Sequence, residues 1–210
     1  MAVIAITSEM GSLGREVAQA AARQLGLRFI DDEAIHCEVA DLMQRPEPSV
    51  HNFLEGHPAI AGSEPIDPTT LSRCTVQKLT ELATGGNVVI RCLGAPIALG
   101  PVGHVLRVRV TAPMADREAT VMERRGLKDR AAARREIEAS DRACASVVQQ
   151  LYGTDYADPA HYDIVINTGR LSVDSSGAAI ATLAGVPEFK ETPETTKRLA
   201  EQLLAARLRR

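Results

Sequence analysis

The sequence predicts an α/β fold in which helices cover both faces of a parallel sheet. Short apolar runs alternate with amphipathic helical segments along the chain, which is typical of parallel strands joined by crossover helices. The first run, residues 3–6, is apolar without interruption, as expected for a strand buried on both faces. A glycine-containing turn then leads into a helical pattern. With 45% apolar residues, the chain of 210 residues can bury a substantial core, and its length fits one domain at residues 1–190.

The first elements follow in a regular order. Residues 16–25 carry apolar side chains on one side, and Gly26 is a natural C-cap, so this segment is predicted to be a helix. A short strand at residues 28–30 comes next. The acidic pair Asp31 and Asp32 then caps a helix that runs to about residue 43.

Residues 44–68 differ in composition from the rest of the chain. Five prolines and two glycines interrupt them, which predicts a long irregular insertion or a small mobile subdomain.

The second half returns to the alternating pattern. The further predicted strands are residues 88–90, 105–110 and 163–167. The further predicted helices are residues 69–84, 114–125, 129–152 and 175–184. Residues 191–210 form a basic amphipathic helix, which is either a packed chain end or a surface for a partner or an anion.

Composition and net charge limit the kinds of partner that we expect for this chain. A net charge of −3 gives no reason to expect binding to nucleic acid, and no apolar run approaches the ~20 residues that a membrane helix needs. The four cysteines lie far apart and form no metal-binding or redox motif, so we expect reduced thiols and a cytoplasmic location. The oligomeric state is left open, with a homodimer as one arrangement.

The turn after the first strand has the outline of a phosphate-binding loop. In "ITSEMGSLGREVA", Gly11 and Gly14 allow the backbone to curl, and the following helix presents its N-terminus to an anion. Ser12 adds a hydroxyl, and Arg15 supplies a cation that can bind two phosphate oxygens. The standard motif has Gly at the position of Glu9, and Lys followed by Ser or Thr at the next two defining positions, where this chain has Arg and Glu. From these residues alone, an ordinary strand–turn–helix remains an alternative.

Several segments, in order, resemble the cytidylate kinase-like family of nucleoside monophosphate kinase relatives. They are "ITSEMGSLGREVA", "LGLRFIDDEAI", "VLRVRVTAPMADREATVMERRGL" and "YGTDYADPAHYDIVINTGRLSVD". The resemblance covers roughly residues 3–185. It implies a P-loop NTPase-like three-layer sandwich with a five-stranded parallel sheet. It also implies an insertion at about residues 32–84 that binds the nucleoside monophosphate, and a helical lid at about residues 115–150.

The resemblance assigns roles to individual residues. Those implied to hold ATP are Gly11, Ser12, Leu13, Gly14, Arg15 and Glu16, with Glu16 also holding Mg²⁺. Those implied to neutralise the transferring phosphoryl group are Arg15, Arg117, Arg124 and Arg142. Those implied to face the acceptor are Asp31, Arg91, Asp141, Asp163, Asn167 and Arg170. From the residues alone, Asp31 also suits a plain N-cap, Asn167 a structural turn and the lid arginines a solvated helix face.

Three positions depart from the family pattern. Leu93 and Cys144 occupy positions where the family carries arginines, and Leu13 stands where it favours glycine. The resemblance as a whole nevertheless implies a kinase that transfers the γ-phosphate of ATP to CMP, dCMP or a related acceptor. It leaves two alternatives: a nucleotide-binding or interaction protein that has lost catalysis, and a kinase of another small molecule.

Overall fold

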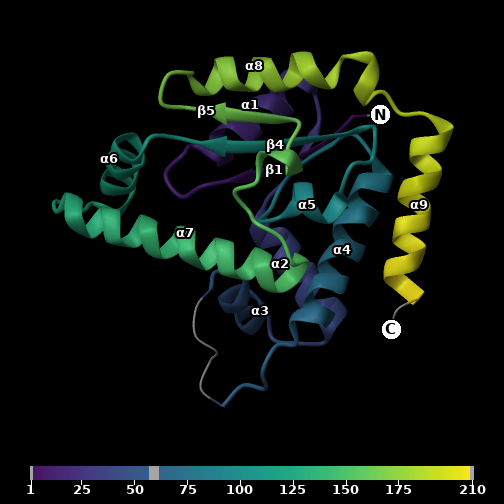
Figure 1. The fold of residues 1–210 in the computed structure, drawn as a ribbon, viewed down its shortest axis with the longest axis horizontal. Coiled ribbons are helices and arrows are strands. Elements are labelled where there is room, and N and C mark those ends of the chain that lie inside the picture. The colour runs from purple at the N-terminus through teal and green to yellow at the C-terminus, as the bar shows by residue number, and fades with distance from the viewer. Residues whose placement is uncertain (1, 57–61, 209–210) are drawn as a thin grey trace.

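The computed structural model describes residues 2–56 and 62–208 and contains a five-stranded parallel sheet (Figure 1). The strand order is β2-β3-β1-β4-β5, and every neighbouring pair is parallel. The strands are β1 (Val3–Ser8), β2 (Arg28–Ile30), β3 (Val88–Arg91), β4 (Val105–Thr111) and β5 (Ile164–Asn167). The predicted α/β class and parallel sheet are confirmed.

Helices form a layer on each side of this sheet, so the molecule has three layers (Figure 1). One layer contains α1 (Gly14–Leu25) and α8 (Val173–Ala184), which pack against each other. The helices on the other side include α2 (Asp32–Met43), α4 (Pro68–Gly85), α5 (Ala95–Leu99) and α7 (Arg130–Tyr152). The remaining helices are α3 (Glu47–Leu54), α6 (Met114–Arg125) and α9 (Pro193–Leu208), with 3₁₀ turns η1 (Pro159–His161) and η2 (Pro187–Phe189).

The central strand β1 explains why its apolar run is uninterrupted. Val3 and Ala5 belong to the hydrophobic core shared with α2, α4 and α5, whereas Ile4 and Ile6 belong to the core shared with α1 and α8. All four side chains are at most 1% exposed. Because successive side chains of a strand point to opposite faces, a strand covered on both faces needs apolar residues at every position.

The prediction for residues 44–68 was wrong in part, because α3 forms within them. Pro46 is the N-cap of this helix and Pro48 lies in its first turn, where the missing N–H group costs nothing. Val50 and Leu54 are buried and stabilise the helix by packing against the core. Residues 57–61 of the predicted insertion lie outside the described residues.

Other boundaries differ by a few residues from the prediction. Helix α5 was not predicted, because its single turn is too short to show a period, although Gly94 and Gly100 cap it. Helix α8 begins at Val173 rather than at residue 175, because the Ser172 side chain caps it by accepting from the N–H of Ser175.

The basic C-terminal helix packs on its own domain, against α4. Leu199 and Ala206 are buried, and Gln202 Nε2 donates to the carbonyl oxygen of Ala98 at 2.9 Å. Arg207 forms an ion pair with Glu81 at 2.8 Å. The described part of this helix is therefore a packed chain end, and residues 209–210 lie outside the described residues.

Two general features complete the fold. All four cysteines are free thiols, as predicted. None of the helices within residues 2–56 and 62–208 combines the length and the apolar character that crossing a bilayer requires.

Candidate active site

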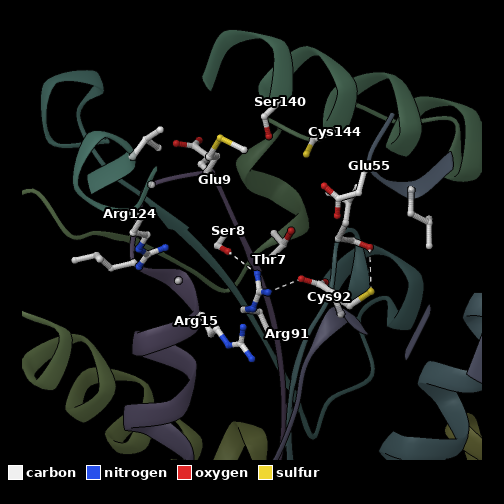
Figure 2. Close-up of a pocket in the computed structure, with 18 of the residues that line it drawn as sticks. Thr7, Ser8, Glu9, Arg15, Glu55, Arg91, Cys92, Arg124, Ser140 and Cys144 are labelled. Atoms are coloured by element: carbon white, nitrogen blue, oxygen red, sulfur yellow. Dashed lines mark hydrogen bonds and ion pairs between the residues drawn. The ribbon is translucent and has the colours of Figure 1, made fainter. Parts of the chain in front are cut away.

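A cavity of about 510 Å³ opens where β1 and β3 end. The glycine loop (residues 9–14) and the start of α1 line one side of it. The start of α2, the end of α3 and residues of the α6–α7 hairpin line the others. Figure 2 shows Arg15 and Arg124 toward one side, and Glu55, Cys92 and Cys144 toward the other. Ligands of parallel α/β sheets bind at the carboxyl ends of the strands, so this cavity is the candidate active site.

Two glycines give the glycine loop its shape. Gly11 has a φ of +79°, and a Cβ there would lie 2.7 Å from the carbonyl oxygen of Arg117. A Cβ on Gly14 would lie 2.1 Å from the Cβ of Ser8, so only glycine allows α1 to start this close to the end of β1. Leu13 precedes α1 in the left-handed conformation, with a φ of 59°, and provides no side-chain cap. The first N–H groups of α1 therefore have no side-chain acceptor in their own N-cap residue.

Ser12 lies inside the loop rather than on the cavity. Its side chain is fully buried, and Oγ lies 2.8 Å from the carbonyl oxygen of Glu9 and 3.2 Å from that of Val110. Its own carbonyl oxygen accepts from Thr168 Oγ1 at 2.9 Å. The hydroxyl that we expected to face phosphate instead ties the loop to β4, and Thr168 ties it to the end of β5.

Glu9 connects the loop to the neighbouring strand and the lid. Its carboxylate forms an ion pair with Arg109 at 2.6 Å and accepts from Thr111 Oγ1 at 2.6 Å. Arg117 Nη1 lies 3.3 Å from the same carboxylate. These contacts explain why a glutamate stands where phosphate-binding loops carry glycine, since here the side chain links β1 to β4 and α6.

Arg117 is buried beneath the loop and does not line the cavity. Its Nε donates to the carbonyl oxygen of Met10 at 2.7 Å. Its two Nη atoms form a bidentate ion pair with the Asp141 carboxylate at 2.6 and 3.0 Å. This geometry suits Arg117 and Asp141 to positioning the α6–α7 hairpin against the loop, rather than to direct contact with a phosphate.

Arg15 and Arg91 converge on the carboxylates that follow β2. Arg91 lies 2.6 Å from Asp31 and 2.5 Å from Asp32. Arg15 Nε lies 2.8 Å from Asp31 Oδ2, but this oxygen has no aligned hydrogen bond among the described residues. The Arg15 side chain is 50% exposed, whereas that of Arg91 is 20% exposed. Arg15 is therefore the more easily released of the two cations, and Arg91 is already neutralised by two acids.

A second contact joins the lid to α1. Arg124 Nη2 lies 2.5 Å from Glu16 Oε1. The other carboxylate oxygen of Glu16, Oε2, is buried and has no hydrogen-bond partner in the described part of the chain. Arg124 lines the cavity, so an arginine of α6 and the first turn of α1 already meet at its edge.

The remaining predicted site residues lie outside the lining of the cavity. Asp163 precedes β5 and binds the Arg107 guanidinium at 2.6 Å and its N–H group at 2.8 Å. Asn167 Oδ1 accepts from the N–H of Gly169 at 2.9 Å, which is the structural turn that the sequence also allowed. Arg142 and Arg170 are exposed. Direct contact of these four residues with a nucleotide stays a prediction, and the Arg107 pair gives Asp163 a structural role.

Sequence reasoning missed several residues on the far side of the cavity, notably Asp32, His36, Glu55 and Cys92. Burial raises the pKa of Asp32 to about 6, although the charge of Arg91 acts in the opposite direction. Burial, and after it the charge of nearby His51, lowers the pKa of His36 to about 4. Burial also raises the pKa of the Cys92 thiol. The only local signal was the spacing of Asp32 and His36, which puts both on one face of a helix.

The conformation of Leu13 leads to a prediction about stability. A non-glycine residue in the left-handed region costs about 1–2 kcal/mol. We therefore expect Leu13→Gly to have a free energy of unfolding about 1 kcal/mol higher than Leu13→Ala, since both variants lack the leucine side chain and only glycine accepts this φ without strain. Urea denaturation of the two variants measures the difference.

The matched control lies in an ordinary helix position. Ala139 is exposed within α7, where Ala139→Gly should lower the free energy of unfolding by about 1 kcal/mol. If glycine is no better than alanine at position 13, the left-handed conformation is not retained in solution.

Comparison with known proteins agrees with this architecture. Residues 3–170 match the model of the cytidylate kinase-like family. The chain is 24% identical over 177 residues to a cytidylate kinase of Pyrobaculum islandicum, covering 84% of this chain and 89% of the relative. It is 32% identical over 104 residues to a cytidylate kinase of Methanopyrus kandleri, covering 46% of this chain and 53% of that protein. A uronate isomerase of Corynebacterium glutamicum is 30% identical over 104 residues, 50% of this chain. The chain thus spans about half of the Methanopyrus relative and only 20% of the isomerase.

Two solved structures share the fold. An uncharacterized protein from Eubacterium ventriosum superposes with a TM-score of 0.68 at 17% identity, covering 88% of this chain and 98% of its own. A shikimate kinase from Bacteroides thetaiotaomicron superposes with a TM-score of 0.52 at 17% identity, covering 88% and 99%. The chain therefore shares with these two proteins the fold described above, a five-stranded parallel sheet between two layers of helices. Together with the family match over most of its length, this places the chain in the cytidylate kinase-like family.

Proposed function

We propose that this protein is a nucleoside monophosphate kinase that transfers the γ-phosphate of ATP to CMP, dCMP or a related acceptor. The observation that carries the proposal is one cavity lined by the start of α1, Arg124 of α6 and Asp32 after β2, with Asp31 paired to Arg15 at its edge. Phosphoryl transfer needs little covalent chemistry from the protein. It needs two aligned substrates and neutralised charge in a site that excludes water.

The donor end is the start of α1. The first N–H groups of α1, which the Leu13 side chain does not cap, and the positive end of the helix dipole suit the phosphates of ATP. Arg15 lines the same region, and its exposed guanidinium can leave Asp31 to bind a phosphate oxygen. Phosphates thus have main-chain and side-chain donors within one turn of helix.

Glu16 fits a magnesium ion bound with the nucleotide. Its buried Oε2 atom lacks a hydrogen-bond partner among the residues described, and Mg²⁺ prefers carboxylate oxygens and water. When bound, the ion neutralises charge on the phosphates of the donor. Glu16 holds Arg124 through its other oxygen, so the same carboxylate orients the lid arginine toward the donor.

The lid supplies Arg124 as the cation nearest the donor. Its position in the cavity lining suits it to the transferring phosphoryl group. Arg142 is exposed on α7 and would reach the group only if the lid moved, a common step in kinases. Arg117 acts as a positioning residue, because its guanidinium is committed to Asp141 and the loop.

A nucleotide-binding protein without catalysis is the second candidate, and the acceptor end favours it. Arg91 is the cation among the cavity residues near the end of β3, and two carboxylates neutralise it. Leu93 and Cys144, which line this end, provide no charge to hold an acceptor phosphate. The same acidic surroundings would suit a small acceptor without a phosphate, which is the third candidate.

Nucleotide binding and turnover can be measured separately. We expect Mg²⁺–ATP at 100 times its Kd to stabilise the protein by about 2.7 kcal/mol, seen as a rise of several degrees in Tm. Release of ADP is then measured with CMP, dCMP, UMP and AMP as acceptors, and we expect the highest rate with CMP or dCMP. Stabilisation by ATP without turnover of any of these acceptors would favour the second or third candidate. No stabilisation by any nucleotide would refute both nucleotide-binding proposals.

A further inference from the structure

A cluster of three potential metal ligands lies at the acceptor end of the cavity. Asp32 and His36 are one turn apart on α2, and Cys92 directly follows β3. A carboxylate oxygen, a ring nitrogen and the thiol sulfur of these residues lie within 4.8 Å of one another. His36 and Cys92 are only 2% and 3% exposed. The three donor atoms therefore lie close together, and the side chains of His36 and Cys92 are shielded from solvent.

His36 provides an independent sign that this space is built for a ligand. Its Nδ1 lies 3.3 Å from Nδ1 of His51, which orients the ring. Its Nε2 is buried and has no hydrogen-bond partner among the described residues. Leaving a buried polar atom unpaired destabilises the fold, so a missing partner is expected to be supplied. A ring held through one nitrogen, with the other nitrogen free, is the usual arrangement of a metal-binding histidine.

We propose that Asp32, His36 and Cys92 bind a divalent metal ion of the zinc type. Thiolate, imidazole and carboxylate are together the ligands that zinc takes, at about 2.0–2.3 Å from the ion. The three donors would move closer together on binding, and the Cys92 thiol would release its proton to solvent. Magnesium prefers oxygen ligands, so this site is chemically distinct from one for the magnesium of a nucleotide.

The surroundings leave one position of the ion open. Arg91 pairs with Asp32 Oδ2 and orients this carboxylate, which also interacts with the Leu93 N–H group and the Cys92 thiol. The ion would take the place of the thiol proton between Cys92 and Asp32. Three protein ligands leave a tetrahedral ion with one place for water or another oxygen ligand. Asp32, His36 and Cys92 all line the cavity, so that place is accessible to a bound molecule.

The ion would supply positive charge near Leu93 and Cys144, where the family resemblance leads one to expect arginines. An acceptor phosphate or hydroxyl could then occupy its open position. This consequence rests on the proposed function, whereas metal binding itself does not.

Cobalt is the probe for the site, because a thiolate bound to Co²⁺ gives a charge-transfer absorption in the near ultraviolet. The full chain is reduced, stripped of metal and titrated with Co²⁺ in the absence of nucleotide. We expect this band to saturate at one equivalent and to disappear when Zn²⁺ is added. Excess Mg²⁺ should not displace the cobalt.

Four variants identify the ligands. Cys92→Ser should abolish the band, and His36→Gln should weaken cobalt binding by at least about tenfold. Cys37→Ser, at an exposed thiol on the same helix, and Cys144→Ser, at a thiol lining the same cavity, should leave the band unchanged. Circular dichroism checks that each variant is folded.

Absence of the band in the unmodified protein, or its persistence in folded Cys92→Ser, would overturn the proposal. If folded His36→Gln bound cobalt as tightly as the unmodified protein, the assigned ligand set would be wrong. A nucleotide-dependent rise in Tm without cobalt binding would refute the metal site alone. Cobalt binding without any effect of nucleotide would refute the proposed function alone.

Discussion

Arg117→Met is expected to lower the free energy of unfolding by about 3 kcal/mol. This is a large effect for a residue whose sequence context also suits a solvated helix face. The Arg117 side chain is 5% exposed and contacts Glu9, Met10 and Asp141. Removing one partner of a buried ion pair costs about 3–5 kcal/mol, because the remaining charge is left without compensation. We expect the lower end of this range, since Asp141 is 38% exposed and Glu9 keeps its pair with Arg109.

Urea denaturation measures this loss, and an exposed pair provides the control. Arg135 lies 3.6 Å from Asp129, and both side chains are well exposed, so Arg135→Met should cost less than about 1 kcal/mol. If the two variants lost the same amount, Arg117 would be a surface charge and not the link between loop and lid.

Arg15→Ala is expected to weaken ATP binding roughly 10- to 150-fold while changing the free energy of unfolding little. A hydrogen bond to a charged group contributes about 1.5–3 kcal/mol, which corresponds to this range of Kd. Arg15 has a half-exposed side chain, and its contact with Asp31 lacks an aligned hydrogen bond, so the folded protein depends little on it. Calorimetric titration with Mg²⁺–ATP measures the effect.

Arg23→Ala is the matched control for this experiment. Arg23 is an exposed arginine in the last turn of the same helix, away from the cavity lining, and its loss should leave ATP affinity unchanged. Unchanged affinity in Arg15→Ala would mean that the glycine loop is a purely structural turn. An equal loss in both variants would indicate a general effect of charge.

Local patterns in the sequence were sufficient for the sheet and most helices. The uninterrupted apolar run of β1 predicted a strand covered on both faces, and the structure puts alternate residues of it in two separate cores. Two helices were not predicted: α5, whose single turn shows no period, and α3, because prolines interrupt its pattern. Pro46 and Pro48 lie at the beginning of that helix, where proline is tolerated.

The candidate site was less accessible to sequence reasoning. The turn and its cation were visible, because Gly11, Gly14 and Arg15 are neighbours in the chain. The partners of Glu9, by contrast, are Arg109 and Arg117, about 100 residues away. A departure from the phosphate-loop pattern at this position therefore has a structural explanation that no local spacing contains.

The sequence by itself determined the five strands, most of the helices, the glycine turn and the family, because each depends on residues close together in the chain or on a pattern along it. Only the tertiary structure decided which charged side chains pair with one another. Arg91 meets Asp31 and Asp32, and Cys92 lies beside Asp32 and His36, because parallel strands bring their carboxyl ends to one edge of the sheet. Arg117 meets Asp141 because α6 and α7 pack against each other. An ion pair or a metal site depends on distances of a few ångströms between side chains, and those distances exist only once the sheet has formed.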